Sequence, residues 1–248
     1  MAKTIVVTGG SRGIGRAVAV GVGALGWSVG VGYREDRAAA DATVAAVERA
    51  GGRAVALAGD VSVEADVMSL FDRTEKALGR LDGAVLNAGI VGPPLPLAEM
   101  SEARLRRTIE VNIVGALLSA REAARRLSVS RGGGGGSIVL VSSAAARLGS
   151  PGEYVDYAAS KGAVDTLCLG LARELARDGV RVNAVRPGVI DTDIHASGGQ
   201  PDRPERLAPS IPIGRPGTAE EVAQAIVWLL GDDASYTTGA LLDVTGGR

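Results

Sequence analysis

Short β-branched runs alternate with longer helical patterns along the whole chain, and this alternation restricts its fold more than any other feature. The strand-like runs lie at 4–8, 28–33, 54–59, 83–89, 137–143, 180–188 and 240–247. The helical patterns lie near 13–25, 37–51, 63–79, 101–129, 155–178 and 218–231, the last with a capping box of Thr218 and Glu221. Such an alternation predicts a parallel sheet whose crossover helices cover both faces. We therefore predict an α/β fold, a doubly wound seven-stranded parallel sheet in a single domain over residues 1–248.

The strands are apolar at almost every position, as expected where both faces of a sheet are buried. With 248 residues, 46% of them hydrophobic and 22% charged, the chain has the composition of one globular domain with a sizeable core. The net charge of -1 gives no reason to expect a nucleic acid or an anionic membrane as a partner.

Three features bear on where the protein works. No targeting peptide is visible, because "KTIVVTGG" already reads as a strand from residue 3. The longest uncharged stretch, 17–33, is too short and too interrupted by glycine to span a membrane. The single cysteine, Cys168, excludes an internal disulfide, and its apolar surroundings indicate a core residue. We expect a soluble, cytoplasmic protein.

Two irregular segments stand out. The five glycines at 132–136 predict a flexible surface loop between a helix and a strand. The segment 191–210, "DTDIHASGGQPDRPERLAPS", follows the carboxyl end of a strand, where long loops commonly form lids over a binding site. Within it, we interpret His195 as a mobile surface residue, with contact to substrate as the alternative. Arg203 and Arg206 are open to two interpretations, a solvated loop or a contact with an acidic carrier.

A glycine-rich loop, "TGGSRGIGRAVAV", follows the first strand and opens the first helix. Gly9, Gly13 and Gly15 allow the backbone to turn tightly and to approach a pyrophosphate, which the amides at the start of the helix would bind. The spacing differs from the standard G-x-G-x-x-G dinucleotide fingerprint, so a plain strand-to-helix turn is the alternative. Because the loop stands between the first strand and a helix, we favour a nucleotide-binding loop.

The end of the second strand discriminates between cofactors. A carboxylate there usually binds the ribose 2′-hydroxyl of NAD, whereas a 2′-phosphate calls for arginine. Here the strand ends in Tyr33 and Arg34, and Arg12 lies in the glycine loop. The sequence therefore favours NADP(H), with NAD(H) as the alternative because Glu35 and Asp36 follow at once.

One tyrosine and one lysine share a helix face in "EYVDYAASKGAVD" at 153–165. Tyr157 and Lys161 are four residues apart, whereas Tyr154 is two turns from the lysine. A phenol titrates near about 10, and an ammonium at ~5 Å would favour the phenolate by roughly 3 kcal/mol. We therefore expect Lys161 to lower the pKa of Tyr157 and make it a proton donor and acceptor near neutral pH. The chain has three lysines against twenty-four arginines, so a lysine at this position indicates a requirement for a compact ammonium.

These motifs resemble a known family. "TGGSRGIG", "NAG" at 87–89, "YAASK" at 157–161 and "RPG" at 186–188 occur in the order and spacing of the short-chain dehydrogenase/reductases. The resemblance covers essentially the whole chain and implies a Rossmann-type fold. It departs from the family pattern at Leu86 and Leu140, where asparagine is common.

The resemblance implies roles for further residues. Ser143 matches the serine that hydrogen-bonds the substrate oxygen, with Ser142 as the less favoured candidate, and Asn112 matches the asparagine that completes a catalytic tetrad with Ser143, Tyr157 and Lys161. The residues expected to bind the cofactor are Gly9, Ser11, Arg12, Gly13, Ile14, Gly15, Arg34, Asp60, Val61, Asn87, Ala88, Gly89, Tyr157, Lys161, Pro187, Gly188, Ile190 and Thr192. No metal site is expected.

We therefore predict an NADP(H)-dependent oxidoreductase that interconverts a ketone and a secondary alcohol, with Tyr157 as the general acid and base. The alternatives are a 3-oxoacyl-carrier-protein reductase, a sugar dehydrogenase of the glucose type that uses NAD or both cofactors, and a nucleotide-binding regulator without turnover. The stretches 108–120 and 162–172 each contain one charged residue, which indicates helices covered by another subunit. We expect a homo-oligomer, and the resemblance implies a homotetramer.

Overall fold

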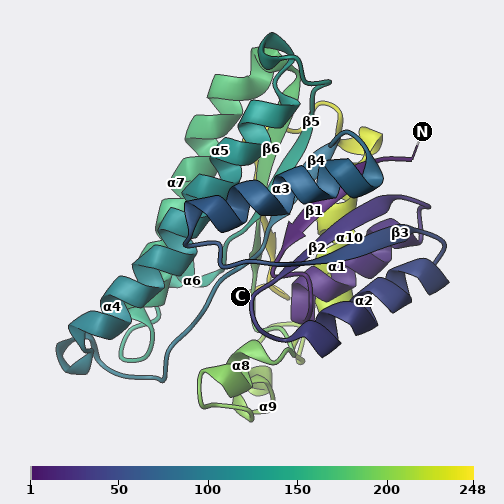
Figure 1. Cartoon of the computed structure of the whole chain (residues 1–248). Helices are drawn as coiled ribbons and strands as arrows, with labels where there is room; N and C mark the ends of the chain where they lie inside the picture. Colours follow the sequence, from purple (N-terminus) through teal and green to yellow (C-terminus); the bar gives the residue numbers. More distant parts are fainter. Residues whose placement is uncertain (1) are drawn as a thin grey trace.

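Seven parallel strands form one sheet in the computed structural model, which describes residues 2–248 (Figure 1). The strand order is β3-β2-β1-β4-β5-β6-β7, and every neighbouring pair is parallel. The strands are β1 (Thr4–Thr8), β2 (Ser28–Tyr33), β3 (Arg53–Ala58), β4 (Gly83–Leu86), β5 (Gly136–Val141), β6 (Val180–Pro187) and β7 (Leu241–Val244). The predicted doubly wound α/β fold is confirmed.

Helices cover both faces of this sheet (Figure 1). One face carries α1 (Gly13–Gly23), α2 (Arg37–Arg49) and α10 (Ala219–Leu230). The other carries α3 (Glu64–Leu78), α5 (Gly115–Leu127) and α7 (Val155–Leu175), with α4 (Glu102–Ile109) packed beside the first turns of α7. Three short helices, α6 (Ala145–Leu148), α8 (Ile194–Ser197) and α9 (Arg203–Leu207), lie in the connections after β5 and β6.

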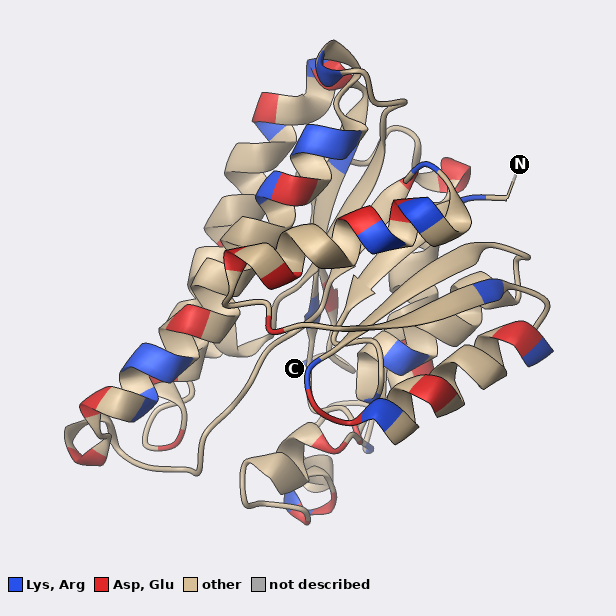
Figure 2. Ribbon diagram, in the orientation of Figure 1, with Lys and Arg blue, Asp and Glu red and all other residues tan. Residues whose placement is uncertain are grey.

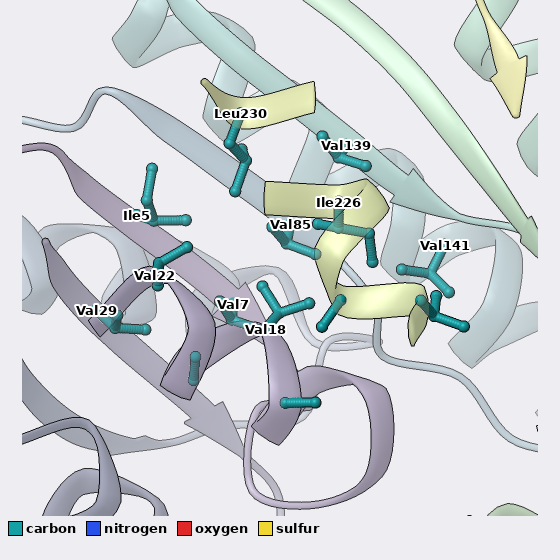
Figure 3. Close-up of a cluster of buried hydrophobic side chains, with 14 of the residues drawn as sticks. Ile5, Val7, Val18, Val22, Val29, Val85, Val139, Val141, Ile226 and Leu230 are labelled. Atoms are coloured by element: carbon teal, nitrogen blue, oxygen red, sulfur yellow. The ribbon is translucent and has the colours of Figure 1, made fainter. Parts of the chain in front are cut away.

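The sheet separates two hydrophobic cores. On β1, Ile5 and Val7 face α1 and α10 together with Val18 and Ile226 (Figure 3), while Val6 faces the opposite side. Successive side chains of a strand point to opposite faces, so a strand buried on both sides has to be apolar throughout. Cys168 belongs to the second core, where burial raises the pKa of its thiol to about 12, as expected of a core residue.

The helix predicted over 101–129 is interrupted. A π-helical turn, Glu110–Val114, joins α4 to α5 and contains Asn112. Such turns widen the helix by one residue and often occur at functional sites.

The capping box of α10 is present as predicted. The hydroxyl oxygen of Thr218 accepts from the Glu221 amide at 3.2 Å.

Within the five glycines at 132–136, Gly133 and Gly136 are packed against neighbouring backbone, whereas Gly132 is exposed with open space where a Cβ would lie. A Cβ on Gly133 would lie 2.4 Å from the Leu127 carbonyl, and one on Gly136 would lie 2.2 Å from the Asp82 carbonyl. These positions admit only glycine because the turn runs directly against the end of α5 and the start of β4.

The strand order reverses direction between β1 and β4, which places a crevice at the carboxyl ends of the two strands.

Charged residues are spread over the surface, with few on the middle of α7 (Figure 2). In the described part of the chain, no helix is both long and apolar enough to cross a membrane.

Candidate active site

Two adjoining cavities open at the carboxyl ends of the strands. The larger, of about 450 Å³, is lined by Ser143, Tyr157 and Lys161. The smaller, of about 300 Å³, follows the glycine loop and the end of β2. Both are lined by Ile14, Asn87, Gly89 and Thr192, so they form one continuous region. Most of the predicted site residues line it, but Asn112 and Gly15 line neither cavity.

The glycine loop has a backbone that other residues rarely adopt. Gly9 and Gly13 have φ angles of 62° and 52°, in the left-handed region that favours glycine. A Cβ on Gly15 would lie 2.2 Å from the Gly9 carbonyl, so this helix start also requires glycine. Asn87 stabilises the loop, because its Nδ2 donates to the carbonyl of Thr8 at 3.1 Å and to that of Gly9 at 2.9 Å.

The smaller cavity has the features that a dinucleotide needs. Its walls contain the glycine loop at the start of α1 and side chains of both charges. The predicted cofactor residues among its lining are Gly9, Ser11, Arg12, Gly13, Ile14, Arg34, Asp60, Val61, Asn87, Ala88, Gly89 and Thr192. The donor groups of this groove therefore fit a nicotinamide dinucleotide.

The acidic residues after β2 are already engaged. The Asp36 carboxylate accepts from the Ala39 amide at 2.9 Å and so caps α2. Glu35 lies 2.5 Å from the Arg34 guanidinium, whose side chain is 47% exposed. Asp36 thus serves as a helix cap, whereas Arg34 and Glu35 are joined to each other by a salt bridge.

Asp60 also has protein partners. Its carboxylate accepts from the Ser62 hydroxyl at 2.6 Å and from Arg107 at 2.8 Å. Burial favours the neutral acid, but the hydrogen bonds from Ser62 and Arg107 outweigh it and lower the pKa of Asp60 to about 2. Arg107 lines the same cavity, although it is not among the site residues predicted from the sequence.

Tyr157, Lys161 and Ser143 meet at the junction of α7 with the end of β5. Nζ of Lys161 lies 5.6 Å from the centre of the Tyr157 ring and donates to the Val141 carbonyl at 2.7 Å. Ser142 is buried, and its hydroxyl donates to the Lys161 carbonyl at 3.1 Å, so it fastens α7 to β5. The Ser143 hydroxyl accepts from the Ala145 amide at 3.1 Å and lies near enough to the phenol of Tyr157 to lower its pKa.

The pKa of Tyr157 differs from expectation. Burial raises it, and this outweighs the lowering by the Ser143 hydrogen bond and by the charge of Arg203. Lys161 is itself buried, which lowers the pKa of its ammonium to about 8 against the opposing charge of Asp165. The pKa of Tyr157 is therefore raised overall and not lowered as expected, because burial of the phenol is the largest cause and favours its neutral form.

Asn112 is 1% exposed and fully bonded within the protein. Its Nδ2 donates to the Ile90 carbonyl at 2.9 Å and to the Ser160 hydroxyl at 3.0 Å, while its Oδ1 accepts from the Ile90 amide at 2.8 Å. A Cβ on Gly89 would lie 3.4 Å from both Oδ1 of Asn112 and Nζ of Lys161. Asn112 thus ties the chain after β4 to α7, close to the lysine.

A buried ion pair holds the first turn of α7. Arg104 donates to the Asp156 carboxylate at 2.9 and 3.1 Å, and its other arm reaches the Pro93 carbonyl. Although burial opposes ionisation, the hydrogen bonds from Arg104 lower the pKa of Asp156, the residue before Tyr157. This pair was not anticipated, since nothing in the sequence links α4 with α7.

The segment 191–210 contains α8 and α9 and forms part of the larger cavity. Pro187, Gly188, Ile190 and Thr192 lead into it along the cavity wall. His195 also lines this wall, with its Nε2 2.9 Å from the Ile190 carbonyl. The ring is half-buried, and burial lowers the pKa of its imidazole. Arg203 was interpreted as a solvated or carrier-binding residue, but its side chain is 14% exposed and lines the cavity.

No group of three or more His, Cys, Asp or Glu side chains within residues 2–248 is arranged to hold a metal ion. The polar groups that converge on the larger cavity are instead a hydroxyl, a phenol and an ammonium. Such a set can hydrogen-bond a substrate oxygen and pass a proton to or from it.

Comparisons with known proteins find relatives over nearly the whole chain. A family model described as enoyl-(acyl carrier protein) reductase matches residues 9–248. The chain is 49% identical over 243 residues to the uncharacterized oxidoreductase YgfF of Escherichia coli strain K12, covering 98% of each chain. It is 36% identical to glucose 1-dehydrogenase 2 of Bacillus subtilis strain 168, over 99% of this chain and 94% of the relative. A crystal structure of a short-chain type dehydrogenase/reductase from Mycobacterium marinum superposes with a TM-score of 0.92 at 33% identity, over 99% of this chain and 94% of that one.

Proposed function

The chain belongs to the short-chain dehydrogenase/reductase family of NAD(P)-dependent enzymes, and on this premise we propose that it interconverts a ketone and a secondary alcohol with NADP(H). The observation that carries the proposal is the meeting of Ser143, Tyr157 and Lys161 in a cavity that adjoins the glycine loop. A hydroxyl and a phenol on one wall can both hydrogen-bond to a single substrate oxygen. That oxygen belongs to the reacting group of a ketone or an alcohol.

In this proposal the substrate oxygen lies between Ser143 and Tyr157. Tyr157 gives its proton to the oxygen in reduction and takes it back in oxidation. The bound dinucleotide supplies the hydride for reduction and accepts it in oxidation. Ser143 donates a hydrogen bond that orients the oxygen, and its position beside the phenol supports this role.

Lys161 and Asn112 assist Tyr157 in this proposal. The Lys161 ammonium stabilises the phenolate that forms when Tyr157 gives up its proton. It also lies close enough to the cofactor groove, at Gly89, to bond the ribose of the dinucleotide. Asn112 supports the lysine by fixing the backbone at Ile90 and the side chain of Ser160.

We assign the preference for NADP(H) to Arg34, with Arg12 in the glycine loop as the second cation. A guanidinium binds a phosphate through two parallel hydrogen bonds, which suits the 2′-phosphate. The use of Asp36 as a helix cap supports this preference, because one of its carboxylate oxygens already accepts from the Ala39 amide.

Two other substrates have support from the comparisons. The description of the matching family model favours an acyl-carrier thioester, and the similarity to a glucose dehydrogenase favours a sugar. Initial rates with NADPH, NADH and their oxidised forms, against ketones, secondary alcohols, sugars and acyl thioesters, distinguish these substrates. The proposal predicts the highest kcat/KM for a ketone with NADPH, and a protein that binds NADPH but turns over none of these compounds contradicts it.

We also propose that the enzyme is a homotetramer. Ile109, Val114 and Leu117 are 49%, 39% and 47% exposed along α4 and α5, although each is apolar. On α7, Gly162 and Gly170 have open space where a Cβ would lie, which allows a second helix to approach. A two-fold axis that pairs these helices between subunits would cover both surfaces.

A further inference from the structure

Arg203 enters the wall of the larger cavity from α9 and is held there by two residues that precede α7. Its Nη2 donates to Oε2 of Glu153 at 2.6 Å, and its guanidinium carbon lies 5.0 Å from the centre of the Tyr154 ring. The side chain is 14% exposed. A salt bridge and a cation–π contact thus fix the plane of the guanidinium, which is not the state of an arginine on a solvated loop.

Most of the hydrogen-bonding capacity of this guanidinium is unused. The guanidinium of arginine has five N–H donors, and Nη2 is the only side-chain nitrogen of Arg203 with a partner among residues 2–248. Its Nε is buried without a hydrogen-bond partner in the described chain. Nη1 also has no protein partner within the described residues and, unlike Nε, is not enclosed, so it is the donor that a group in the cavity can reach.

The charges around the cavity favour an anion as that group. Glu153 is the only carboxylate side chain among the described residues that line the cavity, and it already contacts Arg203. Lys161 also lines the cavity, and its side chain is cationic. The charge of Arg203 also acts on Tyr157 and on His195, so it lies within the field of the reacting groups.

We propose that Arg203 binds a carboxylate of the substrate, and that the ketone or alcohol converted here is therefore an oxo acid or a hydroxy acid. This inference rests on the proposed function and adds the class of substrate to it. Glu153 and Tyr154 orient one edge of the guanidinium, and the donors left over match the planar, two-oxygen geometry of a carboxylate. Such a held arginine binds an anion with little loss of side-chain entropy.

The test compares oxo acids with their uncharged methyl esters: levulinate with methyl levulinate, and para-acetylbenzoate with its methyl ester. The wild-type enzyme with NADPH is expected to reduce the acids with the higher kcat/KM. In Arg203→Met this acid-to-ester ratio is expected to fall about ten- to a hundredfold, mainly through the KM of the acid. Arg203→Lys keeps the charge and is expected to retain part of the ratio, and the exposed lid variant Arg206→Met is expected to leave it unchanged.

The variant Glu153→Gln distinguishes two roles of Arg203. Arg203 either binds a substrate anion or only holds the segment 191–210 against Glu153. The substitution removes the salt bridge but leaves the guanidinium, so the proposal predicts an acid-to-ester ratio at least as high as in the wild type. If Arg203 only fastens the lid to Glu153, both variants lower the rates on acids and esters alike, which overturns the proposal. A ratio that Arg203→Met does not change also overturns it.

Calorimetry of para-acetylbenzoate and its methyl ester with the protein–NADP⁺ complex separates this inference from the proposed reaction. If neither compound is turned over, the proposed function fails for these ketones, and binding still decides the anion site. Binding of the acid that Arg203→Met weakens about tenfold or more supports the site. Equal binding of acid and ester to the wild type contradicts it.

Discussion

Lys161 holds its ammonium 5.6 Å from the centre of the Tyr157 ring, one turn further along α7. Burial raises the pKa of Tyr157 and lowers that of Lys161 to about 8. At neutral pH the pair is therefore a neutral phenol beside a charged ammonium. This is the state that can donate a proton to a ketone while a positive charge stabilises the phenolate left behind.

The pH dependence of reduction should follow the charge of Lys161. Below a pH of about 8 the ammonium is charged, and kcat for ketone reduction should be nearly constant, whereas it should fall as the pH rises further. Asp165, the next acid on α7, raises the pKa of Lys161 by its charge. Asp165→Asn should therefore move the alkaline fall of kcat to lower pH, as measured in pH–rate profiles with saturating NADPH.

A matched variant controls for the ion-pair network around Asp165. Arg186 donates to Asp165 at 2.8 Å and lies 3.9 Å from Asp243. Asp243→Asn also takes a partner from Arg186, but it should leave the alkaline fall of kcat in place. Identical pH–rate profiles for the wild type and Asp165→Asn would contradict the claim that the Asp165 carboxylate raises the pKa of Lys161.

Cofactor choice should depend on Arg34. Arg34→Ala is expected to raise the KM for NADPH about ten- to a hundredfold, because a charged hydrogen bond to the 2′-phosphate contributes roughly 1.5–3 kcal/mol. The KM for NADH should change far less. Glu35→Gln removes the salt bridge at 2.5 Å and should strengthen the preference for NADPH. A wild-type enzyme with the higher kcat/KM for NADH would show that this assignment to arginine is wrong.

The oligomeric state should depend on the apolar surface of α5. Light scattering after gel filtration should give the mass of a tetramer for the wild type and a smaller mass for Leu117→Arg. Leu25→Arg is the control, because Leu25 is 53% exposed at the end of α1, away from the proposed contact. An active wild-type species of 25.1 kDa would contradict the prediction.

The sheet could be predicted from the sequence because its strands are apolar on both faces and are separated by helices. The ends of the strands were less certain: the run at 240–247 was predicted as a strand, whereas β7 covers Leu241–Val244. The π-helical turn at Glu110–Val114 could not be foreseen, since its apolar pattern continues that of the helices on either side.

The candidate site was predictable where it depends on local spacing. Tyr157 and Lys161 are one helical turn apart, and the glycine loop is continuous in the chain. The position of Arg203 depends on Glu153 and Tyr154, about fifty residues earlier, in a segment without periodicity. The raised pKa of Tyr157 depends on burial by several elements, which spacing along one helix does not reveal.

The central claim is that Tyr157, and not Tyr154, transfers the proton. Tyr154 is 5% exposed and lies beneath the Arg203 guanidinium, so Tyr154→Phe keeps the ring and should change turnover little. Tyr157→Phe removes only the phenol oxygen. Its kcat for ketone reduction with NADPH should fall by orders of magnitude, while calorimetry should give a nearly unchanged Kd for NADPH. Equal losses of kcat in the two variants, or a Tyr157→Phe enzyme with wild-type turnover, would contradict the account.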